Sequence, residues 1–222
     1  MNLSIDTIVV PQGAEYQAVC RGLKQTNVQN VNVISIPIGM DNMRQNLVQS
    51  LFQKKHPQQI LLMGLCGSLS PLYSVGDIVL YQQCWDVNRS TVKTNPELTQ
   101  MIQRKFSVDV VTGLTSDRPI CHAAEKLQLS QTYPVSVVDM EGYAYIRELQ
   151  HQGISVAMLR VVSDDLTGDI PDLNGAIDPQ GNLQALPIAI AFLQQPLAAI
   201  GLIRGSLKGL KTLQQITTQL FS

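Results

Sequence analysis

Residues 60–69 read ILLMGLCGSL, in which four large apolar residues run directly into a segment with two glycines. A short apolar run bounded by glycine is typical of a buried strand. We expect this strand to end at Met63 and the chain to turn at Gly64 and Gly67, where the lack of a Cβ lets backbone amides approach a ligand. Such a turn is also an ordinary connection between elements. Only the neighbouring segments can indicate whether it binds a ligand.

Similar short runs rich in β-branched residues lie on both sides of this strand. We expect strands at residues 7–10, 31–37, 59–63, 77–81, 108–113, 136–138 and 154–162. The spacing of apolar residues predicts helices at residues 15–23, 42–54, 96–104 and 140–152, the last ended by Gly153. The alternation predicts an α/β fold in which helices cover a largely buried sheet and ligands bind beyond the carboxyl ends of the strands.

Composition narrows the class of protein. The chain has 222 residues, 45% of them hydrophobic, and no linker or repeat divides it, so we expect a single domain over residues 1–222 with a helical tail at 183–222. A net charge of -1 gives no field to attract nucleic acid. The first residues lack an export signal, the four cysteines form no CxxC pair, and Pro196 divides the longest apolar stretch. We therefore expect a cytoplasmic protein with reduced thiols and no stable membrane insertion.

Carboxylates follow several of the predicted strands. Glu15 comes after the first strand, in the opening turn of a helix, where an acid either faces a crevice or merely complements the helix dipole. Asp77 follows a tight turn, and we interpret it as structural, bonded to local backbone. The segment Thr115-Ser116-Asp117 follows another strand, and its hydroxyls and carboxylate either contact a base or order a loop.

Two further strand ends carry acids in a more specific setting. Asp139 is placed to cap the helix that follows it, so that Glu141 projects from the first turn. A carboxylate at that position accepts two hydroxyl hydrogens at once, which suits a ribose diol. Asp164 and Asp165 end the next strand, where the fold has no need of an acid. We interpret these acids as functional.

Together these segments resemble the nucleoside phosphorylase/nucleosidase superfamily, because its motifs occur here in the family's order. They are Gly64-x-Cys66-Gly67-x-Leu69, Val75-Gly76-Asp77, Thr115-Ser116-Asp117, Met140-Glu141-Gly142 and Ser163-Asp164. The resemblance implies a three-layer αβα sandwich around a central mixed sheet. It also implies cleavage of the N-glycosidic bond of a purine nucleoside, with adenine as the expected base.

The resemblance assigns roles to the matched residues. Asp164 would protonate the leaving base at N7, Glu141 would bind the ribose hydroxyls, and Met140 would pack against the sugar. Glu15 matches, by position, the carboxylate that activates water in the nucleosidases. An oxocarbenium-like transition state needs this combination of leaving-group protonation and a nucleophile on the opposite face. The other residues expected to contact the substrate are Gly67, Cys66, Ser163 and Ser116.

The nucleophile is either water or phosphate. Hexameric phosphorylases of the family carry an arginine before the glycine segment and a serine after its first glycine, whereas this chain has Leu62 and Leu65 there. We therefore favour hydrolysis without a cofactor. Arg44 and Arg118 keep phosphorolysis open, with phosphate as co-substrate. Leu65 also departs from the methylthioadenosine/adenosylhomocysteine nucleosidases, which usually carry a serine at that place.

The tail adds a further alternative. Together with the Gly-Leu-Cys-Gly-x-Leu pattern and residues 116–120, it resembles the hopanoid-associated phosphorylase group, which implies a lipid-linked adenosyl compound as substrate. Arg204, Lys208 and Lys211 share one face of the tail beside an apolar one. Either this region touches a lipid surface or, as we favour, it packs on the domain or on a second subunit. The family also implies a homo-oligomer, a dimer or larger.

Three other hypotheses carry less weight. A nucleoside-binding protein without catalysis would not need both Asp164 and Glu141. A metal hydrolase is disfavoured because the three histidines show no metal-ligand spacing, so no metal is expected. Cys66 is disfavoured as a nucleophile because a small cysteine in a glycine segment is usually a packing residue.

Overall fold

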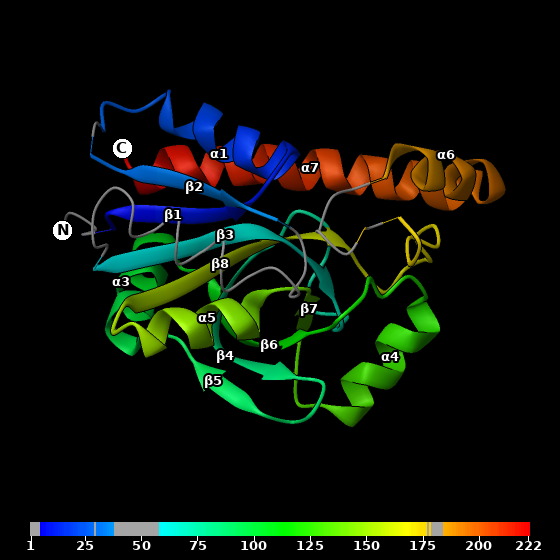
Figure 1. Ribbon diagram of the computed structural model, residues 1–222, viewed down its shortest axis with the longest axis horizontal. Coiled ribbons are helices and arrows are strands. Elements are labelled where there is room, and N and C mark those ends of the chain that lie inside the picture. Colours follow the sequence, from blue (N-terminus) through cyan, green and yellow to red (C-terminus); the bar gives the residue numbers. More distant parts are fainter. Residues whose placement is uncertain (1–4, 29, 38–57, 177, 179–183) are drawn as a thin grey trace.

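A computed structural model describes residues 5–28, 30–37, 58–176, 178 and 184–222 (Figure 1). This part of the chain holds the strands β1 (Thr7–Pro11), β2 (Asn32–Ile36), β3 (Gln59–Ser68), β4 (Ile78–Asp86), β5 (Thr91–Lys93), β6 (Asp109–Thr115), β7 (Val137–Asp139) and β8 (Ser155–Asp164). Its helices are α1 (Ala14–Leu23), α3 (Pro96–Phe106), α4 (Ala123–Thr132), α5 (Gly142–His151), α6 (Ala185–Gln194) and α7 (Pro196–Leu220). All seven predicted strands are confirmed, as are the helices at α1, α3 and α5. The helix predicted at 42–54 lies outside the described residues.

The strands form one mixed sheet. β3 runs parallel to β1 and β8 and antiparallel to β7. Because β8 also pairs with β4, and β4 continues through β6 to β7, the strands β3, β8, β4, β6 and β7 close into a ring. β1 and β2 extend this ring as an open edge. The closure brings the ends of β3, β7 and β8 together.

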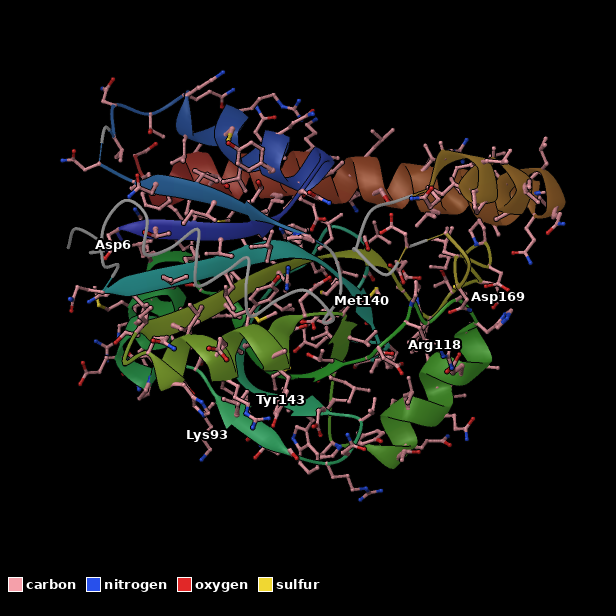
Figure 2. The ribbon with its side chains drawn as sticks, viewed as in Figure 1. Asp6, Lys93, Arg118, Met140, Tyr143 and Asp169 are labelled. Carbon is pink, nitrogen blue, oxygen red and sulfur yellow. The ribbon has the colours of Figure 1, made fainter. Side chains whose placement is uncertain are left out.

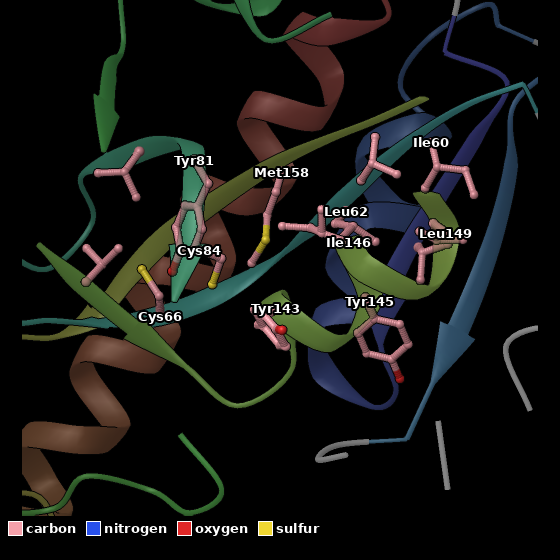
Figure 3. Packing of buried hydrophobic residues seen from close by; sticks show 14 of the residues in the cluster. Ile60, Leu62, Cys66, Tyr81, Cys84, Tyr143, Tyr145, Ile146, Leu149 and Met158 are labelled. Atoms are coloured by element: carbon pink, nitrogen blue, oxygen red, sulfur yellow. The ribbon is translucent and has the colours of Figure 1, made fainter. Parts of the chain in front are cut away.

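Alternate residues of β3 face opposite layers of helices. Ile60 and Leu62 belong to a cluster that includes the buried side chains of α5 (Figure 3). Leu61 and Met63 belong to a second cluster, with buried residues of α1, α3 and α7. All four side chains are at most 2% exposed, and burying each contributes about 1.5–3 kcal/mol. The protein is therefore a three-layer αβα sandwich around a central mixed sheet, as predicted.

The glycine segment is not a turn, which corrects the sequence prediction. β3 continues to Ser68, with only a shift of register between Cys66 and Gly67, because its pairing with β8 extends to Asp164. The glycines instead make room for side chains. A Cβ at Gly67 would lie 2.9 Å from Asp164 Oδ2, and one at Gly64 would lie 2.8 Å from the Oε1 atom of Glu15.

The C-terminal region contains α6 and α7, and α7 packs on the rest of the protein along much of its length. It runs beside α1, where Gly22 leaves room for Thr217. It also crosses the end of β8, where Gly205 and Gly209 lie against the backbone of Ser163. The favoured interpretation, that the tail packs on the domain, is confirmed for this part of α7.

The outer side of α6 and of the first half of α7 is apolar. Large side chains are exposed at Leu186, Ile190, Leu193, Leu197, Ile200, Ile203 and Leu207. Within the described ranges, no helix has the length and apolar character needed to cross a membrane. An exposed apolar surface of this extent is typical of a contact with another macromolecule.

Candidate active site

A cavity lies where the ends of β3, β7 and β8 meet. In the sheet, Gly67 pairs with Asp164 of β8 on one side and with Val138 of β7 on the other. The cavity walls include seven of the eight site residues predicted from the sequence: Glu15, Cys66, Gly67, Met140, Glu141, Ser163 and Asp164. The fold thus brings the predicted residues together at one place.

Ser116 is the predicted residue that does not line the cavity. It is buried in the loop after β6, where its backbone N–H donates to the Asp139 carbonyl at 2.8 Å. Its Oγ accepts a hydrogen bond from the backbone N–H of Arg118 at 3.3 Å. These contacts order the loop, and a direct contact of Ser116 with substrate stays a prediction.

Glu15 reaches the cavity from the first turn of α1. Its Oε1 accepts a hydrogen bond from the backbone N–H of Leu65 at 2.6 Å. Burial raises the pKa of this carboxyl to about 7, although the charge of Arg160 and the bond from Leu65 both lower it. A carboxyl that titrates near neutral pH is suited to take a proton as a general base. An acid that only complements the helix dipole would not need to be buried in the cavity wall, so the dipole alone does not explain Glu15.

A buried arginine holds the acids on the neighbouring wall. Arg160 of β8 is 2% exposed, and its guanidinium lies 3.6 Å from Glu141 Oε2 and 3.8 Å from Asp139 Oδ2. It also donates to the carbonyl of Met63 at 3.2 Å. Burial opposes its charge, but Asp139 and Glu141 outweigh that effect and raise the pKa of Arg160. The three side chains form a buried network that fixes Glu141 at the cavity wall.

The turn before α5 presents Met140 and Glu141 to the cavity. Helix α5 has Glu141 at its N-cap, so the prediction that Asp139 caps the helix and Glu141 projects from its first turn is wrong by two residues. Asp139 still orders the start of the helix, since its Oδ1 accepts from the backbone N–H of Gly142 at 2.8 Å. The Thr115 hydroxyl donates to the same oxygen at 2.9 Å, so the end of β6 orders this turn. In Figure 2, Met140 lies near the ends of β3 and β7, on the side toward Arg118, and both Met140 and Arg118 line the cavity.

Asp164, the last residue of β8, is held at both carboxylate oxygens. The Ser163 hydroxyl donates to Oδ1 at 2.7 Å, and the ammonium group of Lys126 contacts Oδ2. Lys126 lies on α4 and was not anticipated from the sequence. Asp165, interpreted above as functional, is not among the lining residues. Instead, it accepts a hydrogen bond within its own turn from the Thr167 backbone N–H at 2.9 Å.

The remaining chemistry of the cavity is limited. Burial raises the pKa of the Cys66 thiol far above its ordinary value, so the residue is a poor source of thiolate. At the rim, Arg118 is bound by both carboxylate oxygens of Glu125, at 2.5 and 3.2 Å. In the part of the chain that the structure describes, no three His, Cys, Asp or Glu side chains gather to hold a metal ion. Arg44 lies outside that part.

Comparison with known proteins agrees with this arrangement. The sequence pattern of the phosphorylase superfamily matches residues 7–185, which include all of the cavity residues named above. The chain belongs to the phosphorylase superfamily. No curated protein matches it.

Solved structures share the fold of this phosphorylase-superfamily member at low sequence identity. The 5′-methylthioadenosine/S-adenosyl homocysteine nucleosidase of Helicobacter pylori is 14% identical, covers 99% of this chain and 98% of its own, and superposes with a TM-score of 0.71. The futalosine hydrolase of Helicobacter pylori is 15% identical over 96% and 95% of the two chains, with a TM-score of 0.71. The MTA/SAH nucleosidase of Streptococcus pneumoniae, in complex with 8-aminoadenine, is 15% identical over 94% and 98%, with a TM-score of 0.62.

Proposed function

We propose that this protein hydrolyses the N-glycosidic bond of an adenine nucleoside and releases the free base. The observation that carries the proposal is the placement of two carboxyls beside one stretch of β3. Glu15 is bonded to the backbone N–H of Leu65, Asp164 pairs with Gly67 two residues further along β3, and both side chains line the same cavity. Inverting glycosidases likewise use one carboxyl as the acid and a second as the base that activates the attacking water.

Each cavity residue then has one task. Asp164 gives a proton to N7 of the base while the electrons of the bond between C1′ and N9 pass into the purine. Glu15 takes a proton from the water that attacks C1′ on the opposite face. Glu141 accepts hydrogen bonds from the ribose hydroxyls, and Met140 packs against the sugar. Phosphate is not needed, and no cofactor enters the reaction.

The described part of the cavity favours water over phosphate. Leu62 is buried in the core, and Leu65 offers only its backbone N–H, which Glu15 already uses. Arg118 is engaged by Glu125 at the rim. All three similar structures named above are hydrolases by their names, which supports hydrolysis, and the two MTA/SAH nucleosidases among them support adenine as the base.

A product assay tests this function. The purified protein is incubated with adenosine, 5′-methylthioadenosine, S-adenosylhomocysteine and futalosine, with and without phosphate, and base and sugar are separated by chromatography. We expect free base and free sugar without phosphate. A strict need for phosphate, with sugar 1-phosphate as product, would make the protein a phosphorylase. No release from any of the four would point to a lipid-linked adenosyl substrate or to binding without turnover.

We also propose that the protein is a homo-oligomer. The support is the apolar outer side of α6 and α7, where Leu193 and Leu197 are 83% and 84% exposed. Light scattering in solution measures the mass directly, and Leu197→Lys is expected to shift the protein toward the monomer. A wild-type mass of one chain would contradict this proposal.

A further inference from the structure

Lys126 is an unusual residue to find buried. It is the one buried residue of α4, a helix that the structure describes completely, and its side chain is 1% exposed. Helices normally bury apolar side chains, and taking an ammonium group out of water costs several kcal/mol unless a partner offsets it. An apolar residue at this position would pack at lower cost. The stability of the fold therefore does not explain this buried lysine, and the explanation lies in its contacts at the cavity.

The partners of Lys126 supply that explanation. Its ammonium group contacts Asp164 Oδ2 and donates to the Asp165 carbonyl at 3.1 Å. The other oxygen of Asp164 is bonded to the Ser163 hydroxyl at 2.7 Å. The carboxyl therefore has a donor on each oxygen, and its orientation at the cavity wall is fixed.

We propose that Lys126 is a positioning residue for the leaving-group proton transfer, an inference that rests on the proposed function. When the glycosidic bond breaks, the Oδ–H bond of protonated Asp164 breaks and an N7–H bond forms on the base. The carboxylate left behind is stabilised by the ammonium group of Lys126, which keeps its own three protons. Because this stabilisation develops as the proton moves, it lowers the barrier rather than merely tightening substrate binding.

Substrates with different leaving groups distinguish a role of Lys126 in proton transfer from a purely structural role. Adenine departs readily only when protonated, whereas p-nitrophenolate departs as a stable anion. Lys126→Met is expected to lower kcat/KM for an adenine nucleoside by about 10²-fold, within the range of general-acid effects. It is expected to lower kcat/KM for p-nitrophenyl β-D-riboside less than about 10-fold. The ratio of the two values does not depend on how much of the sample is folded.

Two further variants keep the test decisive. Lys105→Met is the matched control, because Lys105 lies on α3 and bonds to the Leu220 carbonyl at 2.9 Å, outside the cavity walls. The double variant Lys126→Met/Asp164→Asn leaves no unpaired buried charge if Lys126→Met alone does not fold. If Lys126 acts through Asp164, the double variant is as slow on the adenine nucleoside as Asp164→Asn alone.

The outcomes distinguish the two proposals. An unchanged substrate ratio in Lys126→Met, or multiplicative losses in the double variant, would overturn the role of Lys126 and leave the proposed function intact. A wild-type protein that cleaves no purine nucleoside would remove the proposed function, and this inference with it. A changed ratio, with losses that do not multiply, is the result that the geometry predicts.

Discussion

Replacing Glu15 with glutamine distinguishes the role of this residue as a general base from its structural role as a hydrogen-bond acceptor. The amide oxygen of the new side chain can still accept the Leu65 N–H bond, but the group can no longer take a proton from water. Loss of a general base typically lowers the rate by about 10²–10⁴-fold. The wild-type rate should also rise with pH through about 7, where Glu15 ionises, and the residual rate of the variant should not.

The same substitution has a predicted effect on stability, with a definite sign. The pKa of Glu15 is raised from its ordinary 4.5 to about 7, so the folded state holds a proton that the unfolded chain releases between these values. Folding stability therefore falls as pH rises from 4.5 to about 7, by at most roughly 3 kcal/mol. Because the carboxyl faces the cavity and is partly exposed, we expect about 1–2 kcal/mol.

Thermal unfolding at two pH values measures this effect. Near pH 8, Glu15→Gln should raise Tm by roughly 2–8 °C for a chain of this size, and near pH 5 the gain should be much smaller. Glu97→Gln is the matched control, since Glu97 is also in the first turn of a helix but is exposed. Equal shifts in Tm at both pH values would contradict the claim that burial raises the pKa of Glu15. Full activity of Glu15→Gln would refute its role as the base.

Three other substitutions test the walls of the cavity. Glu141→Gln should lower kcat/KM for adenosine by about 10–100-fold, because a charged acceptor of the ribose hydroxyls is lost. It should also reduce the preference for ribose over 2′-deoxyribose. An unchanged preference would contradict the role of Glu141 in binding the hydroxyls. Arg160→Met should destabilise the protein by about 3–5 kcal/mol in denaturant unfolding, since it leaves Asp139 and Glu141 buried without their cation. Gly64→Ala should destabilise by about 1–3 kcal/mol because its Cβ would meet first the buried guanidinium of Arg160 and then Glu15, whereas Gly168→Ala, with open space around it, should change little.

The sheet and most of the cavity could be predicted because their signals are local. The alternation of Ile60, Leu61, Leu62 and Met63 between two layers needs only apolar residues at every position, which the sequence displays directly. The end of α5 is equally local, since Gly153 adopts a φ of 73° that favours glycine. Because ligands of α/β sheets bind beyond the carboxyl ends of strands, the acids that follow those ends could be expected to meet.

Most of the errors and omissions involve contacts between distant parts of the chain. The glycine segment has the composition of a turn, and the pairing that keeps it in β3 comes from β8. Arg160 lies within an apolar run, and its partners on β7 and the following turn become visible only after the sheet has closed. Lys126 carries no motif, and its significance depends wholly on Asp164, 38 residues away. β5 is too short, at three residues, to show a pattern of its own.

Asp164 is the residue on which the proposed reaction depends most, so the steady-state rate of adenine release by Asp164→Asn is the most direct measurement. Asparagine keeps nearly the same shape beside Ser163 but has no transferable acidic proton. The rate should fall by about 10²–10⁴-fold, while Asp109→Asn, at an exposed position at the start of β6 and outside the cavity, should release adenine at the wild-type rate. An Asp164→Asn rate within about threefold of wild type, well below that range, would contradict the assignment of this cavity as the active site.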